Sequence, residues 1–208
     1  MSSAALNHRR GMSLIELGVA SLLGVLVLGI MVQFFVSALQ IGQRSVMRSR
    51  LQQTGTTALL AMIQDLQQAN AGGLTFRPDA QLRMIHCIIH PVDDISGDGL
   101  PQYSSQVLID YFLAPSQRLL TRRTFDAKRP SPIPLRSGEP MRFTPQQIDI
   151  LQQGRAREKL YPGVASLTIS TPGVEPEFVG NPLRIELILQ EGREEVHCIR
   201  SVVLRNSL

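Results

Sequence analysis

The sequence predicts an α+β chain in which one very long N-terminal helix precedes an antiparallel β-sheet. The first of 13 prolines is Pro78, so no proline interrupts a helix in the first third of the chain. The remainder contains short apolar runs separated by proline, glycine, aspartate and serine, which is typical of strands joined by turns. Residues 17–43 carry no aspartate, glutamate, lysine or arginine, and this uncharged run of 27 residues favours a membrane anchor.

The composition argues against nucleic acid as a direct partner. The 208 residues suit one domain with an accessory segment. Their net charge is +4, but residues 1–11 supply Arg9 and Arg10, and the rest holds 19 basic residues (21 minus 2) against 17 acidic ones. Tryptophan is absent and aromatic residues make up 5%, so side chains that stack on bases are scarce.

The uncharged run is long enough for one membrane crossing, for which about 20 helical residues suffice. It is too long for a cleavable secretory signal, whose apolar stretch is usually ~7–15 residues. Arg9 and Arg10 precede it and are expected to stay cytoplasmic. We therefore expect a single-pass inner-membrane protein with a cytoplasmic N-terminus and a periplasmic C-terminal part.

One helix is predicted from residue 14 to about residue 70. Its second half contains charged residues and an apolar stripe with spacings of three, four and seven, which favours packing on a domain. The charged residues are Arg44, Arg48, Arg50 and Asp65, and the stripe is Met47, Leu51, Ala58, Met62 and Leu66. Gly72 and Gly73 predict the end of the helix.

Six strands are predicted beyond the helix, at residues 82–89, 106–113, 118–125, 165–170, 183–190 and 196–204. Residues 106–113 and 118–125 are close enough for a hairpin, as are residues 183–190 and 196–204, which turn at residues 191–193. Residues 126–145 hold five prolines and are expected to be irregular.

The segment "RRGMSLIEL" at residues 9–17 resembles the class III signal of type IV prepilins. The matching positions are Gly11, Leu14, Ile15, Glu16 and Leu17, while Met12 replaces the usual phenylalanine and Ser13 the commoner threonine. The resemblance implies that a prepilin peptidase cuts between Gly11 and Met12 and methylates the new amino terminus. It also implies a type IV pilin-like fold with no enzymatic activity.

Glu16 is the one acidic residue at the start of this apolar helix. A lone carboxylate near the middle of a bilayer costs ~2.5–3.5 kcal/mol on insertion scales, so such residues usually pair or mark function. The resemblance implies that Glu16 pairs with the α-amino group of Met12 from a neighbouring subunit and sets the register between subunits. Leu14, Ile15 and residues 17–39 then pack between helices. The alternative is a Glu16 that stays hydrated at the cytoplasmic interface.

Two later segments extend the resemblance. Residues 50–70 resemble the amphipathic helix of PilW-like minor pilins and of GspJ-like type II secretion pseudopilins, and "VVLRNSL" at the C-terminus resembles the last PilW-like strand. The organisation implied is a leader (1–11), a membrane and filament-core helix (12–43), an amphipathic helix (44–72) and a β-rich head (73–208).

The function implied is that of a PilW-like minor pilin in type IV pilus assembly. The partners implied are the prepilin peptidase, other minor and major pilins, the inner membrane and the assembly platform. A GspJ-like minor pseudopilin is the alternative within the superfamily. A membrane-anchored periplasmic ligand-binding domain is the alternative outside it.

Three weaker patterns remain open. Cys87 and Cys198 form a disulfide if their strands are neighbours, and otherwise stay as buried thiols. His86, His90 and His197 alternate with the cysteines, which permits a zinc site but favours half-exposed strand histidines. Asp94, Ser96 and Asp98 have the spacing of calcium ligands, yet Ser105 stands where a glutamate is needed, which favours a plain Asp-Gly turn and no cofactor.

The remaining basic residues form two groups. Arg122 and Arg123 are adjacent, and Arg155, Arg157 and Lys159 lie close together. Both groups are interpreted as solvated faces. No nucleophile motif or glycine-rich phosphate loop is present in the sequence, so it offers no positive sign of catalysis.

Overall fold

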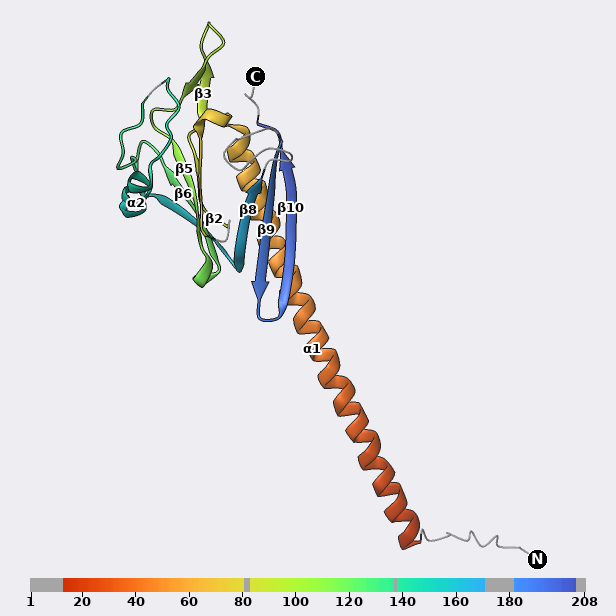
Figure 1. Cartoon of the computed structure of the whole chain (residues 1–208). Coiled ribbons are helices and arrows are strands. Elements are labelled where there is room, and N and C mark those ends of the chain that lie inside the picture. The colour runs from red at the N-terminus through yellow and green to blue at the C-terminus, as the bar shows by residue number, and fades with distance from the viewer. Residues whose placement is uncertain (1–12, 81–82, 137, 171–181, 205–208) are drawn as a thin grey trace, which may run out of the picture. The chain divides into compact units, whose positions relative to one another are not determined.

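The computed structural model describes residues 13–80, 83–136, 138–170 and 182–204, and it divides into two compact units, Met1–Val46 and Met47–Leu208. Helix α1 (Leu14–Gln67) is 54 residues long and contributes to both units. All the strands belong to the second unit and pair antiparallel. The predicted α+β class is confirmed (Figure 1).

In the first unit, α1 is exposed around its whole circumference. Every residue from 13 to 50 is exposed. The hydroxyls of Ser21 and Ser37 donate to the carbonyls of Leu17 and Gln33, four residues earlier, at 2.9 Å each. These two hydroxyls are therefore satisfied within the helix, as an apolar environment requires.

The described residues of the second unit form three antiparallel sheets where the sequence predicted one. They are a five-stranded sheet in the order β1-β2-β5-β6-β7, a three-stranded sheet in the order β10-β9-β8, and the pair β3-β4. The strands are β1 (Leu74–Pro78), β2 (Met84–Ile89), β3 (Val92–Ile95), β4 (Pro101–Tyr103), β5 (Leu108–Ala114), β6 (Leu119–Phe125), β7 (Arg157–Pro162), β8 (Val164–Ser170), β9 (Leu183–Glu191) and β10 (Glu194–Val202).

All six predicted strands are present, as β2, β5, β6, β8, β9 and β10, and both predicted hairpins form. The hairpin of β5 and β6 closes through the 3₁₀ turn η2 (Pro115–Gln117) and Arg118, whose φ is 50°. The hairpin of β9 and β10 turns at Gly192, whose φ is 61°. A glycine relieves the strain of this left-handed conformation at the second turn.

The larger hydrophobic core packs the second half of α1 against one face of the five-stranded sheet and against the three-stranded sheet. It includes Leu51, Ala58, Leu59, Met62 and Leu66 from α1, Cys87, Ile109, Tyr111 and Leu120 from the larger sheet, and Ile185, Leu187 and Leu189 from β9. A Cβ on Gly55 would lie 2.7 Å from the sulfur of Cys198 and from Leu189 Cδ1. Glycine at this position therefore lets the smaller sheet approach the helix.

A second core covers the opposite face of the five-stranded sheet. It joins Ile88, Leu108 and Phe125 to Ile148 and Leu151 of the short helix α2 (Pro145–Gln153). In the view of Figure 1 the sheet lies between α2 and the second half of α1. Successive strand residues point to opposite faces, so the sheet is buried on both sides.

Helix α2 lies outside the predicted elements, although its start signal is present in the sequence. Thr144 accepts a hydrogen bond from the backbone of Gln147, whose side chain accepts one from the backbone of Thr144, and Pro145 occupies the first turn. This is a capping box. Before it, residues 126–144 contain only turns and an isolated bridge between Asp126 and Arg129 in the part that is described, which confirms the irregular segment.

The end of α1 is close to the predicted one. The helix ends at Gln67, and Gly72 and Gly73 follow in the 3₁₀ turn η1 (Ala71–Gly73). The side chain of Asn70 accepts hydrogen bonds from the backbone of both glycines.

Candidate functional site

The most unusual surface of the described chain is the apolar first half of α1. Large aliphatic and aromatic side chains stand exposed along it, from Leu14, at 88% exposure, to Ile41. Among the described residues, α1 is the one helix long and apolar enough to cross a membrane. Water is a poor solvent for a helix that is apolar on all sides, so lipid or other helices must cover it.

Ser13 and Glu16 form a capping box at the start of this helix. The backbone N–H of Ser13 donates to Glu16 Oε2 at 2.9 Å, and the backbone N–H of Glu16 donates to Ser13 Oγ at 3.3 Å. Two donors that a helix leaves unpaired at its N-terminus are thus satisfied. The negative carboxylate also lies at the positive end of the helix dipole. The structure thus gives Glu16 a role within its own chain that the sequence analysis did not assign.

Gly11 and Met12, the predicted cleavage and methylation positions, lie outside the described residues. Leu14, Ile15 and Leu17 occupy the first turn of α1 with Glu16 and are exposed. Within the described chain, the Glu16 carboxylate accepts one hydrogen bond, from the backbone of Ser13.

A partly buried ion pair fixes the second half of α1 to the five-stranded sheet. Arg122 of β6 donates from Nε to Asp65 Oδ2 at 2.6 Å and from Nη2 to Asp65 Oδ1 at 2.8 Å. The Tyr111 hydroxyl donates to Asp65 Oδ2 at 2.5 Å. The hydrogen bonds to Asp65 raise the pKa of Arg122, while burial, followed by the charge of Asp65, raises the pKa of Tyr111.

The neighbouring Arg123 performs a similar task on the other face of the sheet. Its guanidinium donates to the backbone carbonyls of Leu151, Gln152 and Gly154 at 3.0, 3.2 and 2.7 Å. These carbonyls lie at the C-terminal end of α2, where no further helical turn follows, and that of Leu151 also accepts the backbone N–H of Gly154 at 3.1 Å. The expectation that Arg122 and Arg123 form a solvated face is wrong, because each arginine connects the sheet to a different helix. Arg155, Arg157 and Lys159 are exposed, as expected.

Cys87 and Cys198 do not form the predicted disulfide, and both are free thiols. The physical reason is that β2 and β10 belong to different sheets, so the cysteines are not cross-strand neighbours. Cys87 is fully buried, and burial together with the charge of Asp110 raises its pKa. Cys198 is partly exposed and its sulfur lies against Gly55.

The three strand histidines occupy separate environments. His86 is buried, with Nδ1 3.1 Å from Asp110 Oδ1 and Nε2 2.8 Å from the side-chain nitrogen of Gln152. His90 is buried with Nε2 2.6 Å from the carbonyl of Ser104, whereas His197 is exposed beside Glu195 and Glu186. They do not converge on a zinc site, and the expectation of half-exposed histidines is wrong for His86 and His90.

Asp94, Ser96 and Asp98 lie at the hairpin between β3 and β4. Asp94 Oδ1 accepts from the backbone of Ile95, and Ser96 Oγ accepts from the backbone of Leu100. Gly99, which follows Asp98 in this turn, has a φ of 79°. These contacts are those of a turn, and the described residues contain no group of three or more histidine, cysteine, aspartate or glutamate side chains that could hold a metal ion.

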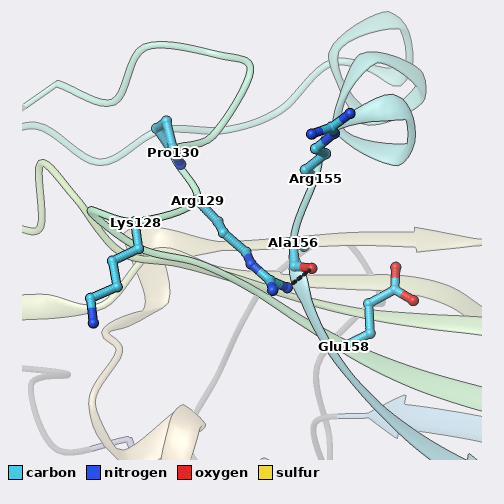
Figure 2. A pocket seen from close by; sticks show the side chains of 7 residues that line it. Lys128, Arg129, Pro130, Arg155, Ala156 and Glu158 are labelled. Carbon is cyan, nitrogen blue, oxygen red and sulfur yellow. Dashed lines mark hydrogen bonds between the residues drawn. The ribbon is translucent and has the colours of Figure 1, made fainter.

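An open hollow of about 680 Å³ lies beside Lys128, Arg129 and Arg155. Figure 2 shows that its cationic side chains do not converge. Arg129 donates to the carbonyl of Ala156 at 2.9 Å, while Lys128 and Arg155 point away from each other. The acidic residue Glu158 also lines the hollow. The hollow therefore has no common point at which an anion would meet all three cations.

No protein-family model, curated protein or solved structure matches the chain.

Proposed function

We propose that the chain is a minor subunit of a type IV pilus, prepilin-like in its N-terminal signal and PilW-like in its amphipathic helix, that acts by assembly. The observation that carries the proposal is the exposed apolar helix that begins at Leu14, with Glu16 in its first turn, within the prepilin-like segment of residues 9–17. Before assembly, lipid covers this helix. In the filament, the helices of neighbouring subunits replace the lipid.

The geometry of Glu16 supports a contact between subunits as well as a helix cap. Oε2 accepts the backbone N–H of Ser13, and Oε1 has no partner within the described chain. A carboxylate accepts several hydrogen bonds, so the cap and an added donor are compatible. After cleavage before Met12, the donor is the methylated ammonium group of a neighbouring subunit, and the attraction is strong where water is excluded.

The same features suit a GspJ-like pseudopilin of a type II secretion system. Recovery of the chain from a pilus or from a secretion pseudopilus distinguishes the two systems. The prepilin peptidase and the assembly platform are the partners in either case. The outside alternative, an anchored ligand-binding domain, needs neither cleavage nor a charge at Glu16.

The experiment compares Glu16→Gln with Glu16→Ala and the natural chain. Glutamine also serves in a capping box, so Glu16→Gln keeps the cap and removes the charge. We expect both variants to enter the membrane and both to be missing from filaments sheared off the cells. Immunoblots of membrane and sheared fractions measure this. If Glu16→Gln is incorporated normally while Glu16→Ala is not, Glu16 acts as a helix cap only and the pairing role is wrong.

A further inference from the structure

We infer that the second unit, Met47–Leu208, binds an extended segment of a partner protein, which adds as a strand to the outer edge of β10. This segment carries alternating apolar side chains and one acidic side chain. The binding place is a groove of about 490 Å³ lined by residues of β10 and of the second half of α1. We call it the β10 groove. It lies wholly in the Met47–Leu208 unit, and the inference goes beyond the proposed function and needs no N-terminal processing.

The first wall of the groove is the open edge of a sheet. β10 stands at the end of the three-stranded sheet, and in the described part of the chain its backbone pairs with β9 alone. Five consecutive residues, 196–200, line the groove. Consecutive strand residues point to opposite faces, so a surface that touches all five includes the backbone edge itself. Such an edge presents unpaired N–H and C=O groups to an incoming strand.

The second wall is a stripe of α1. It consists of Gln52, Thr56, Leu59, Leu60 and Ile63, which recur at spacings that place them on one side of a helix. Leu60 is 56% exposed although it belongs to the part of α1 that packs on the head. A strand paired with β10 would place every second side chain against this stripe. Those side chains are therefore apolar.

The positive charge of Arg200 in the groove favours an acidic residue in the bound segment. The Cys198 sulfur lies against Gly55 of α1, so Arg200, two residues further along the strand, lies on the same face. Its guanidinium donates to the carbonyl of Ile199 at 3.4 Å, and none of the described residues that line the groove is acidic. Glu195 and Glu186 are engaged with His197. An acidic side chain directly opposite Arg200 would complete its pairing.

A second copy of the chain fits this place less well than a different protein. Two β10 strands that pair antiparallel about a twofold axis would run the second halves of their α1 helices in opposite directions. Chains anchored in one membrane by the same end have the same direction. The partner is therefore a different protein with a free extended segment.

Cys198 provides a native reporter for the test, because it lines the groove and Cys87 is fully buried. The probe is the synthetic peptide Thr-Glu-Thr-Val-Thr-Val-Thr, which in antiparallel register puts glutamate opposite Arg200 and valines opposite Cys198 and Val196. The measurement is the rate at which N-ethylmaleimide alkylates Cys198 in the full-length protein in detergent. We expect the peptide to slow alkylation in a saturable way.

Two kinds of control separate strand addition from unspecific adhesion. A lysine in place of the peptide glutamate is expected to bind at least about threefold more weakly, since exposed charge pairs have small effects. In the Arg200→Glu variant, the lysine peptide should bind more tightly than the glutamate peptide. In the Arg184→Glu variant, whose change lies outside the groove, the glutamate peptide should still bind more tightly. Of two peptides that are N-methylated at alternate residues, only the one whose methyl groups face β10 should fail to protect Cys198.

The inference is overturned if the peptide leaves alkylation unchanged up to about 1 mM, a concentration that corresponds to very weak binding. Protection by both N-methylated peptides, or an unchanged preference in Arg200→Glu, would equally contradict strand addition. If the full-length protein dimerises in detergent and the peptide separates the dimer, the occupant is a second copy and our assignment is wrong. None of these results bears on cleavage at Gly11 or on Glu16.

Discussion

His90 and His197 show how two histidines in one head acquire opposite acid–base behaviour. His90 Nε2 faces the carbonyl of Ser104, and its Nδ1 is buried with no partner in the described chain. A proton on Nδ1 would therefore find no acceptor, and burial lowers the pKa of His90 below its ordinary value of 6.5. The hydrogen bond to Glu195, followed by the one to Glu186, raises the pKa of His197 above 6.5.

These shifts predict a maximum in the contribution of the two histidines to stability near pH 6.5. The part due to His197 is complete below pH 6.5 and is lost as the pH rises through its raised pKa. The part due to His90 is complete above pH 6.5 and is lost as the pH falls through its lowered pKa. NMR titration of the histidine ring protons measures both pKa values.

The variant Glu195→Gln provides the control for His197. It removes the first cause of the shift, so the pKa of His197 should move back toward 6.5 while that of His90 stays where it is. An unshifted His197 in the natural chain, or a His90 that titrates above 6.5, would contradict these assignments.

At the scale of elements, the Asp65–Arg122 pair determines how α1 is attached to the sheet. The change Asp65→Ala should lower the free energy of unfolding by about 3 kcal/mol, because it leaves a largely buried guanidinium without a counter-charge. Urea unfolding of the full-length protein in detergent measures this. Asp149→Ala is the matched control, since the Asp149–Arg77 pair is 3.0 Å long but exposed, and it should cost less than about 1 kcal/mol. Equal losses in the two variants would show that Asp65 is not a key attachment.

Arg123 is expected to attach α2 to the five-stranded sheet, as Asp65 and Arg122 attach α1. Arg123→Ala removes a charged donor from three carbonyls at the end of α2, of which, in the described chain, only that of Leu151 keeps another donor, the backbone N–H of Gly154, and a hydrogen bond to a charged group is worth about 1.5–3 kcal/mol. Hydrogen exchange of the α2 amides should therefore accelerate at least tenfold, while exchange in β9 stays unchanged. Arg129→Ala, which removes an exposed arginine bonded to the carbonyl of Ala156, should leave α2 protected. If Arg129→Ala accelerates exchange of the α2 amides as much as Arg123→Ala does, the effect is not due to the hydrogen bonds of Arg123 to the end of α2.

The elements that the sequence predicts well are those with a strong local signal. The proline-free start predicts α1, and short loops between apolar runs predict the hairpins of β5 with β6 and β9 with β10. β7 was missed because it is a sheet edge with five of its six residues exposed, so it lacks an apolar alternation. Contacts such as Asp65 with Arg122 join residues 57 positions apart, and no local pattern indicates them.

At the scale of the whole molecule, the sequence predicts the class of the chain better than its layout. The long helix and the β-rich remainder follow from composition and periodicity, but the division into separate sheets depends on packing against both helices. This division also explains why Cys87 and Cys198 are not paired. For the candidate site, the sequence identified Glu16 by its neighbours, and the structure adds the Ser13 cap that makes the charge-neutral variant informative.

The most direct test of the account is the intact mass of the protein extracted from membranes of cells with an active prepilin peptidase. The account predicts a chain that has lost residues 1–11 and begins with an N-methylated Met12. A chain that still begins at Met1, or one cut after the apolar run, would contradict it.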